Sequence, residues 1–253
     1  MSAKPLFDRP IAHRGLHDRS KGIIENTASA FEAACRHGFA IECDVQLSRD
    51  GIPMIFHDDD LDRLTGVPGP VSANSMAELA TYKLLGSATG DTPQTFAQFL
   101  AQVDGRVLLQ IELKQQPDQA TTDVLAQTVL DALSGYRGPV TIESFDPRLL
   151  VALRKRGAAY PLGIVTYDYK EPEWDAEMGG GRKFTLRHLL HWPQTRFDFI
   201  SCRDTSLDLP AVKLFRSFGI PVTTWTIKSS AAALVVMGKA DQIVFEGFLP
   251  PSA

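Results

Sequence analysis

Eight short apolar segments, rich in branched residues and separated by amphipathic stretches, constrain the fold of this chain more than any other feature. In the amphipathic stretches apolar residues recur every three or four positions, as in helices. One such stretch begins near Asn26, which can cap a first turn, and ends at Gly38. The alternation predicts an α/β fold with a parallel sheet, and eight parallel strands predict a closed barrel. The predicted strands are residues 10–13, 39–46, 107–113, 140–144, 161–165, 197–201, 222–227 and 242–246.

The chain has 253 residues and 44% hydrophobic content, which suits one domain spanning 1–253. Two regions interrupt the alternation of strands and helices. Residues 58–105 are too long for a simple loop and predict a small inserted segment. Residues 167–183 are charged and glycine-rich, and we expect a mobile surface loop there.

The formal net charge of −4 provides no global positive field to attract nucleic acid, so we expect a small substrate. The three cysteines, Cys35, Cys43 and Cys202, cannot all pair. The first residues lack the apolar run of a secretory signal or membrane span. We therefore expect a cytoplasmic chain with reduced thiols and no stable membrane anchor. Exposed barrel helices can pair, so a homo-oligomer stays open.

Glu42 and Asp44 lie two residues apart at the end of a predicted strand, which puts both carboxylates on one face. Adjacent negative charges repel unless a cation lies between them, and a hard divalent cation, Mg²⁺ or Ca²⁺, suits oxygen ligands. The alternative is a pair of solvated surface acids, although the apolar neighbours favour an embedded strand. Cys43 faces the other way and is predicted to pack in the core.

The next predicted strand carries a similar pair, Glu112 and Lys114, after an apolar run. At the carboxyl-terminal mouth of a barrel these side chains could complete a metal shell and hold a phosphate oxygen. A simple surface ion pair is the alternative.

His13 and His57 each follow a short apolar segment, at predicted strand ends. Because imidazole has an ordinary pKa near 6.5, one could act as general base and the other as general acid near neutral pH. Each could instead be a structural histidine. The other four histidines are expected at surface or structural positions: His17, His37, His188 and His191.

Eight motifs follow one another along nearly the whole chain. The first four are His13-Arg14-Gly15, Glu25-Asn26-Thr27, Glu42-x-Asp44-Val45 and His57-Asp58. The later four are Asp62-Arg63-Leu64-Thr65-Gly66, Ile111-Glu112-Leu113-Lys114, Glu143-Ser144-Phe145-Asp146 and Thr224-Trp225-Thr226. In this order they resemble the glycerophosphodiester phosphodiesterase family, bacterial cytoplasmic type.

The resemblance implies a TIM (β/α)8 barrel in which the segment 58–105, after the second strand, is the family's insertion. It also implies one divalent cation, Mg²⁺ or Ca²⁺. The metal ligands would be Glu42, Asp44 and Glu112. The acid and base would be His13 and His57. The substrate-binding residues would be Arg14 and Lys114, at the phosphate oxygens, and Phe145 and Trp225, in the pocket wall.

The sequence departs from the family pattern at two late positions. Ile227-Lys228 stands where similar proteins have Val-Asn, and Phe245-Glu246-Gly247 stands where they have Thr-Asp. We expect both departures to lie away from the metal and histidine motifs and to affect recognition of the alcohol. Lys228 could add a positive charge at the pocket rim, although we expect a solvated lysine.

The expected activity is metal-dependent hydrolysis of glycerophosphodiesters to sn-glycerol 3-phosphate and an alcohol. Acid and base groups contribute about 10² to 10⁴ each, whereas enzymes lower barriers by up to about 23 kcal/mol in the general range. The metal, Arg14 and Lys114 must therefore stabilise developing charge. The roles of the two histidines stay open, as does attack by water or by the neighbouring glycerol hydroxyl.

Two alternatives remain. One is a lysophospholipase D or sphingomyelinase D type activity on lipid headgroups, which needs an apolar entry surface. The segment 58–105 could supply it through Val67, Val71, Met76, Leu79, Leu84 and Leu85. The other is a non-catalytic phosphate-binding barrel, which the presence of every proposed acid, base and ligand disfavours.

Overall fold

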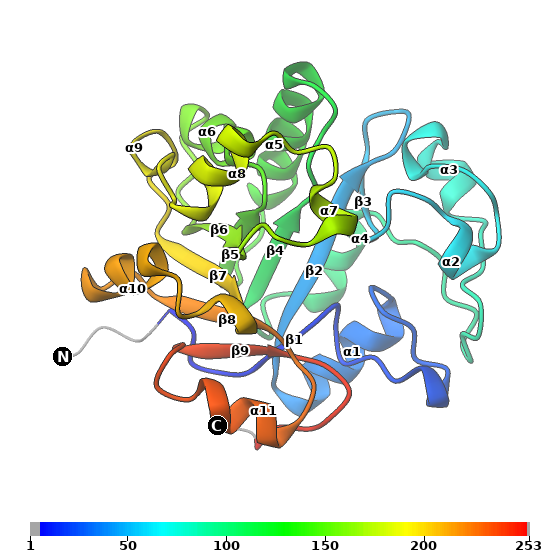
Figure 1. Cartoon of the computed structure of the whole chain (residues 1–253). Helices are drawn as coiled ribbons and strands as arrows, with labels where there is room; N and C mark the ends of the chain where they lie inside the picture. The colour runs from blue at the N-terminus through cyan, green and yellow to red at the C-terminus, as the bar shows by residue number, and fades with distance from the viewer. Residues whose placement is uncertain (1–5, 252–253) are drawn as a thin grey trace.

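The computed structural model describes residues 6–251, and in this range eight parallel strands close into a barrel (Figure 1). The strands are β1 (Ile11–Ala12), β2 (Ala40–Leu47), β4 (Leu109–Leu113), β5 (Val140–Ser144), β6 (Leu162–Thr166), β7 (Phe199–Arg203), β8 (Val222–Ile227) and β9 (Gln242–Phe245). Each pairs with the next in this order, and β9 returns to β1. The predicted TIM barrel is confirmed, because all eight apolar segments form its strands.

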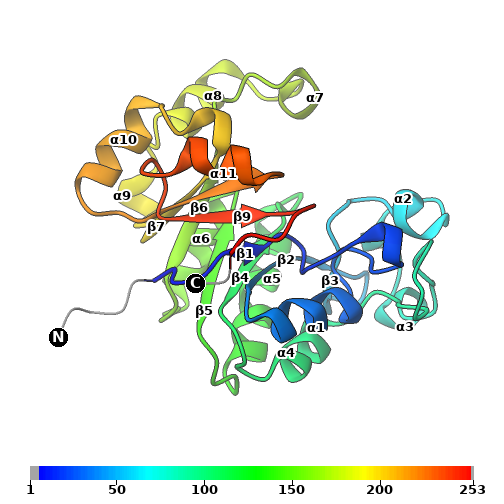
Figure 2. The same ribbon diagram turned by 90° about the horizontal axis from the view of Figure 1, so that it is seen from below.

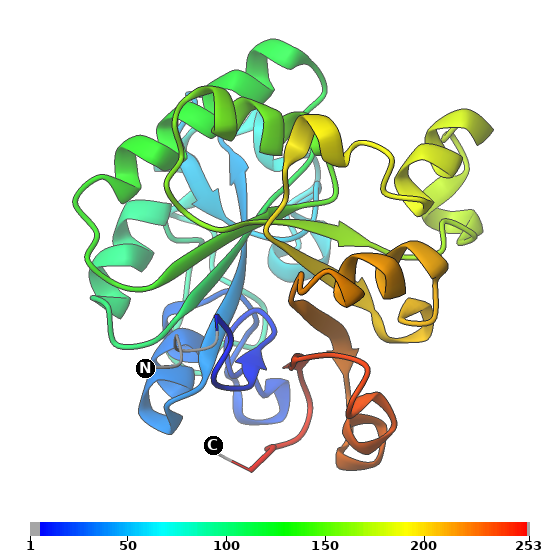
Figure 3. The same cartoon turned by 90° about the vertical axis from the view of Figure 1, so that its left-hand side faces the viewer.

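Helices surround the strands, as Figure 3 shows. The longer ones are α1 (Ala28–His37), α4 (Phe96–Val103), α5 (Gln119–Leu133), α6 (Pro147–Lys155), α8 (Gly180–Arg187), α10 (Pro210–Ser217) and α11 (Ser230–Val236). The short ones are η1 (Arg19–Lys21), α2 (Asp62–Thr65), η2 (Val71–Ala73), α3 (Met76–Leu79), α7 (Pro172–Asp175), α9 (Trp192–Thr195) and η3 (Asp204–Ser206). Among residues 6–251 no helix is long and apolar enough to cross a membrane.

The core explains the strand pattern of the sequence. Every residue of β2 is buried, and Cys43 packs there as predicted. Leu125 and Val129 of α5 and Leu149 of α6 join the same apolar cluster. Burial on both faces is typical of parallel strands that helices cover, so β2 can hold its carboxylates away from bulk water.

The start of α1 differs from the prediction. The residue that caps the helix is Thr27, whose hydroxyl accepts from the Ala30 backbone N–H, and not Asn26. Asn26 has a φ of 55°, a left-handed conformation that Asn tolerates, and its Nδ2 donates to Asp44 Oδ2 at 2.8 Å. Gly38 ends the helix with a φ of 73°, as predicted. Asn26 is therefore turned toward β2 instead of serving the helix.

The segment 58–105 has two parts. Before α4 it forms α2, η2 and α3, which lie together at one side of the molecule in Figures 1 and 2. Their apolar side chains, such as Leu64 and Leu79, form a cluster separate from the main core. The helix α4 instead packs in the main core through Phe96 and Phe99. The strand β3 (Pro53–Ile55), antiparallel to β2, leads into this region.

Residues 167–183, predicted as a mobile surface loop, contain α7 and the start of α8 at one end of the molecule, joined by non-helical stretches at 167–171 and 176–179 (Figure 2). Tyr167 and Tyr169 are buried with Leu186 in a small cluster of their own. The Tyr167 hydroxyl donates to Asp175. The charge and glycine content obscured these aromatic residues, which give the segment its core.

Candidate active site

One cavity of about 740 Å³ opens at the carboxyl-terminal ends of the barrel strands. It brings together all nine predicted site residues: His13, Arg14, Glu42, Asp44, His57, Glu112, Lys114, Phe145 and Trp225. The seven polar residues come from β1, β2 and β4 and the segments that follow these strands. Phe145 and Trp225 come from the end of β5 and from β8. The carboxyl-terminal mouth is where parallel barrels assemble active sites from separate strands.

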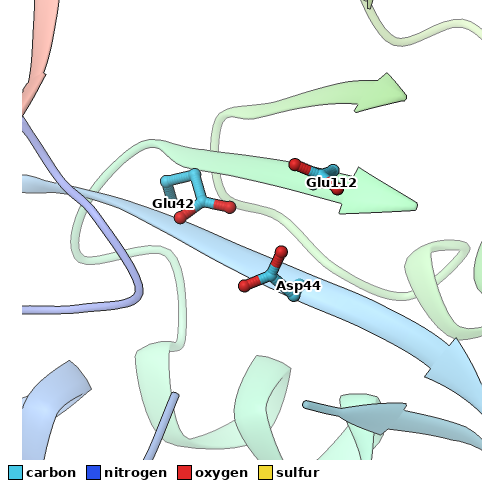
Figure 4. A group of neighbouring side chains, drawn as sticks. All are labelled: Glu42, Asp44 and Glu112. Carbon is cyan, nitrogen blue, oxygen red and sulfur yellow. The ribbon is translucent and has the colours of Figure 1, made fainter. Parts of the chain in front are cut away.

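Three carboxylates that line the cavity lie close together on the neighbouring strands β2 and β4 (Figure 4). The strand register sets Asp44 of β2 beside Glu112 of β4, and the two-residue period places Glu42 on the same face. One oxygen of each carboxylate lies within 4.8 Å of the others, and all three residues are buried. The strand geometry alone therefore concentrates three acidic groups in a dry space.

Two cations lie directly against this triad. Lys114 Nζ lies 2.6 Å from Asp44 Oδ1 and 2.7 Å from Glu112 Oε1. The Arg14 backbone N–H donates to Glu42 Oε2 at 2.9 Å, and its Nε lies 3.5 Å from Asp44 Oδ2. Although burial opposes it, Asp44 and Glu112 raise the pKa of Lys114 above its ordinary value, so this lysine stays charged.

The charge is not fully compensated. Burial, followed by the charges of Asp44 and Glu112, raises the pKa of Glu42 well above its ordinary value. Burial also disfavours an ionised Asp44, yet Lys114, His57 and Arg14 hold the pKa of Asp44 well below its ordinary value. Three buried carboxylate oxygens that share too little positive charge fit a hard divalent cation. The triad could therefore hold a metal ion.

The loop after β1 aims His13 at the triad. Arg14 has a φ of 54° and Gly15 a φ of 79°, and a Cβ at Gly15 would lie 2.9 Å from the Ala30 Cβ. Only glycine fits this tight turn. His13 Nε2 then lies 4.0 Å from Glu42 Oε2.

Glu246, directly after β9, fixes the other side of the His13 ring. Its Oε2 lies 2.6 Å from His13 Nδ1, and this hydrogen bond holds the pKa of Glu246 well below its ordinary value. An ionised carboxylate can only accept, so His13 Nδ1 carries a proton and donates it. Burial lowers the pKa of His13 to about 4, against the effect of Glu246. His13 is therefore neutral at pH 7, with its Nε2 lone pair toward the triad.

His57 stands at the start of a chain of ion pairs that leads back to Arg14. Its Nδ1 lies 2.7 Å from Asp58 Oδ1, and Arg63 bonds both Asp58 and Glu25. Glu25 accepts from Arg14 Nη1 at 2.6 Å. Burial opposes ionisation of Glu25, but Arg63 and Arg14 lower its pKa to about 2. The two histidines thus share one arrangement, a carboxylate at Nδ1, and the network ties their loops together.

Aromatic rings line the opposite part of the cavity. Phe145 lies edge-on to Trp225 with ring centroids 5.6 Å apart, and edge-on to Tyr167 at 6.1 Å. Trp174 of α7 stacks on Trp225 with centroids 6.4 Å apart. The sequence singled out two of these four rings. Trp174 was hidden because it comes from the segment read as a loop.

The two departures from the family pattern meet inside the site, which contradicts the expectation that they lie away from its motifs. Lys228 Nζ lies 2.8 Å from Glu246 Oε1, although the lysine side chain is 71% exposed. His17, expected at a surface or structural position, also lines the cavity, with Nε2 3.7 Å from Glu246 Oε2. Since β9 closes on β1, the residue after β9 must face the residue after β1. Applying the strand-end argument to the last strand would have found Glu246.

The remaining histidines fit the structural expectation. His37 and His188 bond the backbone carbonyls of Ala33 and Phe184, one helical turn earlier. His191 is buried, and burial lowers its pKa to about 4.

Comparison with known proteins identifies the sequence family and relatives with the same fold. The model of the Glycerophosphoryl diester phosphodiesterase family matches residues 13–244. A Bacillus subtilis (strain 168) protein provisionally named as a glycerophosphodiester phosphodiesterase is 26% identical over 235 residues, 90% of each chain. Among solved structures, an Oleispira antarctica phosphodiesterase in complex with the product sn-glycerol-3-phosphate has a TM-score of 0.76, 23% identity and coverage of 95% of this chain and 93% of its own. A Parabacteroides distasonis glycerophosphodiester phosphodiesterase has a TM-score of 0.74 and 17% identity, with 94% and 92% coverage.

Proposed function

Because the chain belongs to the glycerophosphoryl diester phosphodiesterase family, we propose that it hydrolyses glycerophosphodiesters to sn-glycerol 3-phosphate and an alcohol by metal-dependent, two-histidine catalysis. The observation that carries the proposal is the convergence of a buried acidic triad with two carboxylate-anchored histidines in one cavity. The volume of that cavity, about 740 Å³, lies within the range typical of small-molecule sites.

Glu42, Asp44 and Glu112 would hold one divalent cation, Mg²⁺ or Ca²⁺. When bound, such an ion stabilises negative charge that develops on the phosphoryl oxygens. Its ligands already have the oxygen chemistry that both ions prefer. Family membership and the triad support metal dependence without distinguishing the two ions.

Arg14 and Lys114 bind the non-bridging phosphate oxygens in this proposal. Both are held against the triad, Lys114 by two carboxylates and Arg14 by Glu25, so they need no reorganisation when charge develops. Both remain protonated, since Asp44 is the leading charge that raises the pKa of each group against the effect of burial. Phosphate therefore meets positive charge that is already fixed in place.

His13 and His57 exchange protons with the reacting oxygens. One accepts the proton of the attacking water or glycerol hydroxyl as its oxygen forms a bond to phosphorus, and the other donates a proton to the departing alcohol oxygen as the P–O bond to the alcohol breaks. Where the glycerol hydroxyl attacks, water then opens the cyclic phosphate to sn-glycerol 3-phosphate. Glu246 and Asp58 orient the two rings through their Nδ1 atoms, which directs each Nε2 atom toward the reaction.

The direct test is release of sn-glycerol 3-phosphate from a panel of glycerophosphodiesters. We expect release from glycerophosphocholine, glycerophosphoglycerol and glycerophosphoinositol by the wild-type chain. Reaction in isotopically labelled water, with the cyclic phosphate followed by phosphorus NMR, distinguishes attack by water from attack by the neighbouring glycerol hydroxyl. A cyclic phosphate that never appears and is not turned over when supplied would exclude the second route. Absence of product from every diester, in the presence of Mg²⁺ and Ca²⁺, would overturn the proposal.

A lipid-directed activity has less support. Of the six apolar residues in 58–105 considered as a membrane entry surface, Val71, Leu79 and Leu84 are buried in that segment's own cluster, and Val67 and Met76 are partly buried against it. Leu85 is the exception, at 46% exposed. Turnover of lysophosphatidylcholine in preference to glycerophosphocholine would favour the lipid-directed alternative.

A further inference from the structure

The aromatic part of the cavity is built around a tryptophan at its rim. Trp174 of α7 is 55% exposed and stacks on Trp225, with 27° between the ring planes. Tyr167 meets Trp174 edge-on, with centroids 5.5 Å apart. Phe145 completes the wall by contacting both Trp225 and Tyr167. Substrate bound with its phosphate at Arg14 and Lys114 would extend toward this wall on one side.

An arginine already occupies the face of this rim tryptophan. The Arg203 Cζ atom lies 5.2 Å from the centroid of the Trp174 ring, and its Nη1 donates to Glu171. Arg203 ends β7, whereas Trp174 and Glu171 belong to the segment around α7. Arg203 therefore links α7 to the barrel through an ion pair with Glu171 and a cation–π contact with Trp174.

This arrangement bears on which alcohols the wall can accept. Aromatic faces recognise quaternary ammonium groups because the ring attracts a cation placed over it. On Trp174 a cation of the protein, Arg203, already lies over the ring. An incoming ammonium group must therefore displace Arg203 or bind close to it against the repulsion of like charges. Displacement also breaks the pair with Glu171. Both costs weigh against a choline-like alcohol.

The same side chains suit hydroxyl groups. A guanidinium carries five N–H donors in a planar fork, and Arg182, from α8, contributes a second guanidinium to the cavity. Arg182 Nη2 donates to Oε1 of Gln115, in the loop after β4, at 3.2 Å. Of the two nearby carboxylates, Glu171 pairs with Arg203, and Asp204, which lines the cavity, accepts from the Thr205 backbone N–H through Oδ1. Donors over ring faces fit an uncharged polyol.

We propose that Phe145, Tyr167, Trp174 and Trp225 form the subsite for the leaving alcohol and that Arg203 makes it select an uncharged polyol over a quaternary ammonium alcohol. The inference rests on the proposed hydrolysis of glycerophosphodiesters. Arg203 acts here on substrate choice and takes no part in proton transfer.

The test compares kcat/KM for glycerophosphoinositol and glycerophosphocholine in wild type and in Arg203→Gln. We expect wild type to prefer the inositol diester and Arg203→Gln to raise the choline-to-inositol ratio about tenfold, equivalent to 1.4 kcal/mol. The ratio is measured on one sample, so partial unfolding of a variant does not alter it. Trp174→Ala should raise KM for the inositol diester, and because Trp174 is exposed the fold should survive its removal.

Arg196→Gln is the matched control. Arg196 lies over Trp192 at 5.3 Å, the same contact outside the cavity, and its substitution should leave the substrate ratio unchanged. A wild-type preference for choline, or an Arg203→Gln ratio equal to that of wild type, would overturn the polyol subsite while leaving the hydrolysis intact. Failure of wild type to release sn-glycerol 3-phosphate from any diester of the panel would overturn the proposed function, and the subsite with it.

Discussion

In the half of the cavity formed by β1, β2 and β4, charged side chains are buried and bonded to one another, whereas in the half formed by β5, β6, β8 and α7 aromatic rings pack against one another and reach the rim at Trp174. Asp44 exemplifies the first half, with direct contacts to Lys114 and Asn26. Trp174 exemplifies the second, since it is more than half exposed. The first half is arranged for charge stabilisation and the second for contact with a variable group.

The difference indicates where substitutions should act. A buried charge that loses its partner is costly, because desolvation is no longer offset. Exposed pairs and rim contacts contribute little individually. Substitutions in the charged half should therefore change kcat by orders of magnitude, and those at the rim should change substrate choice or give small effects.

The largest effect is expected for Asp44→Asn. It removes one proposed metal ligand together with the partner of Lys114, and a bound metal supplies several kcal/mol of charge stabilisation, so kcat/KM should fall about 10³-fold or more. Calorimetric titration should show weakened Mg²⁺ binding. Asp208→Asn, at an exposed lysine-paired aspartate, is the control. Wild-type metal affinity in Asp44→Asn would exclude its ligand role.

His13→Ala should come next. Loss of one acid–base group costs roughly 10² to 10⁴ in kcat, and the acidic triad should still bind metal because no carboxylate changes. Steady-state kinetics and the same calorimetric titration separate the two effects. His37→Ala, which removes a histidine bonded only locally at its helix, should behave as wild type. Unchanged turnover in His13→Ala would contradict the acid–base role.

Glu246→Gln should lower kcat by roughly 10²-fold, less than loss of the histidine itself, because the ring remains but loses its ionised anchor. Glu246 raises the pKa of His13, so its removal should lower that pKa, and whichever limb of the pH–kcat/KM profile reports His13 should move to lower pH. Glu246→Asp should restore part of the activity. A profile superimposable on wild type would mean that Glu246 does not position His13.

The smallest effect is expected for Lys228→Met. The lysine pairs with Glu246 but is mostly exposed, so the pair is screened by solvent, and kcat/KM should change by about threefold or less. That change should disappear at high salt, measured in 0.05 and about 0.5 M NaCl, where the Debye length is short. A loss comparable to that of Glu246→Gln would place Lys228 in the charged half of the cavity.

The charged half could be predicted from sequence because its residues lie at the ends of strands whose order is readable. Glu42, Asp44 and Glu112 follow apolar runs, and parallel register brings them together without further information. His13 ends another such run. Local periodicity and barrel topology predict that these residues meet, and the resemblance to the family adds the roles that periodicity leaves open.

The rim could not be predicted because its contacts join segments that no periodicity links. Trp174 contacts Trp225, which lies about fifty residues later in the sequence. Trp174 itself belongs to a segment whose glycines and charges resemble a loop. Glu246 was missed for a different reason. Its contact with His13 depends on barrel closure, which pairs the last strand with the first. Strand count implies that closure, but local periodicity does not indicate which side chains meet across it.

The central element of the proposed mechanism is a divalent cation bound by Glu42, Asp44 and Glu112. The decisive measurement is sn-glycerol 3-phosphate release by protein dialysed against EDTA, with metal content checked by elemental analysis, before and after adding Mg²⁺ or Ca²⁺. We predict that release falls to background without metal and returns when one of the two ions is added. Release at the full rate by metal-free protein in excess EDTA would contradict the account.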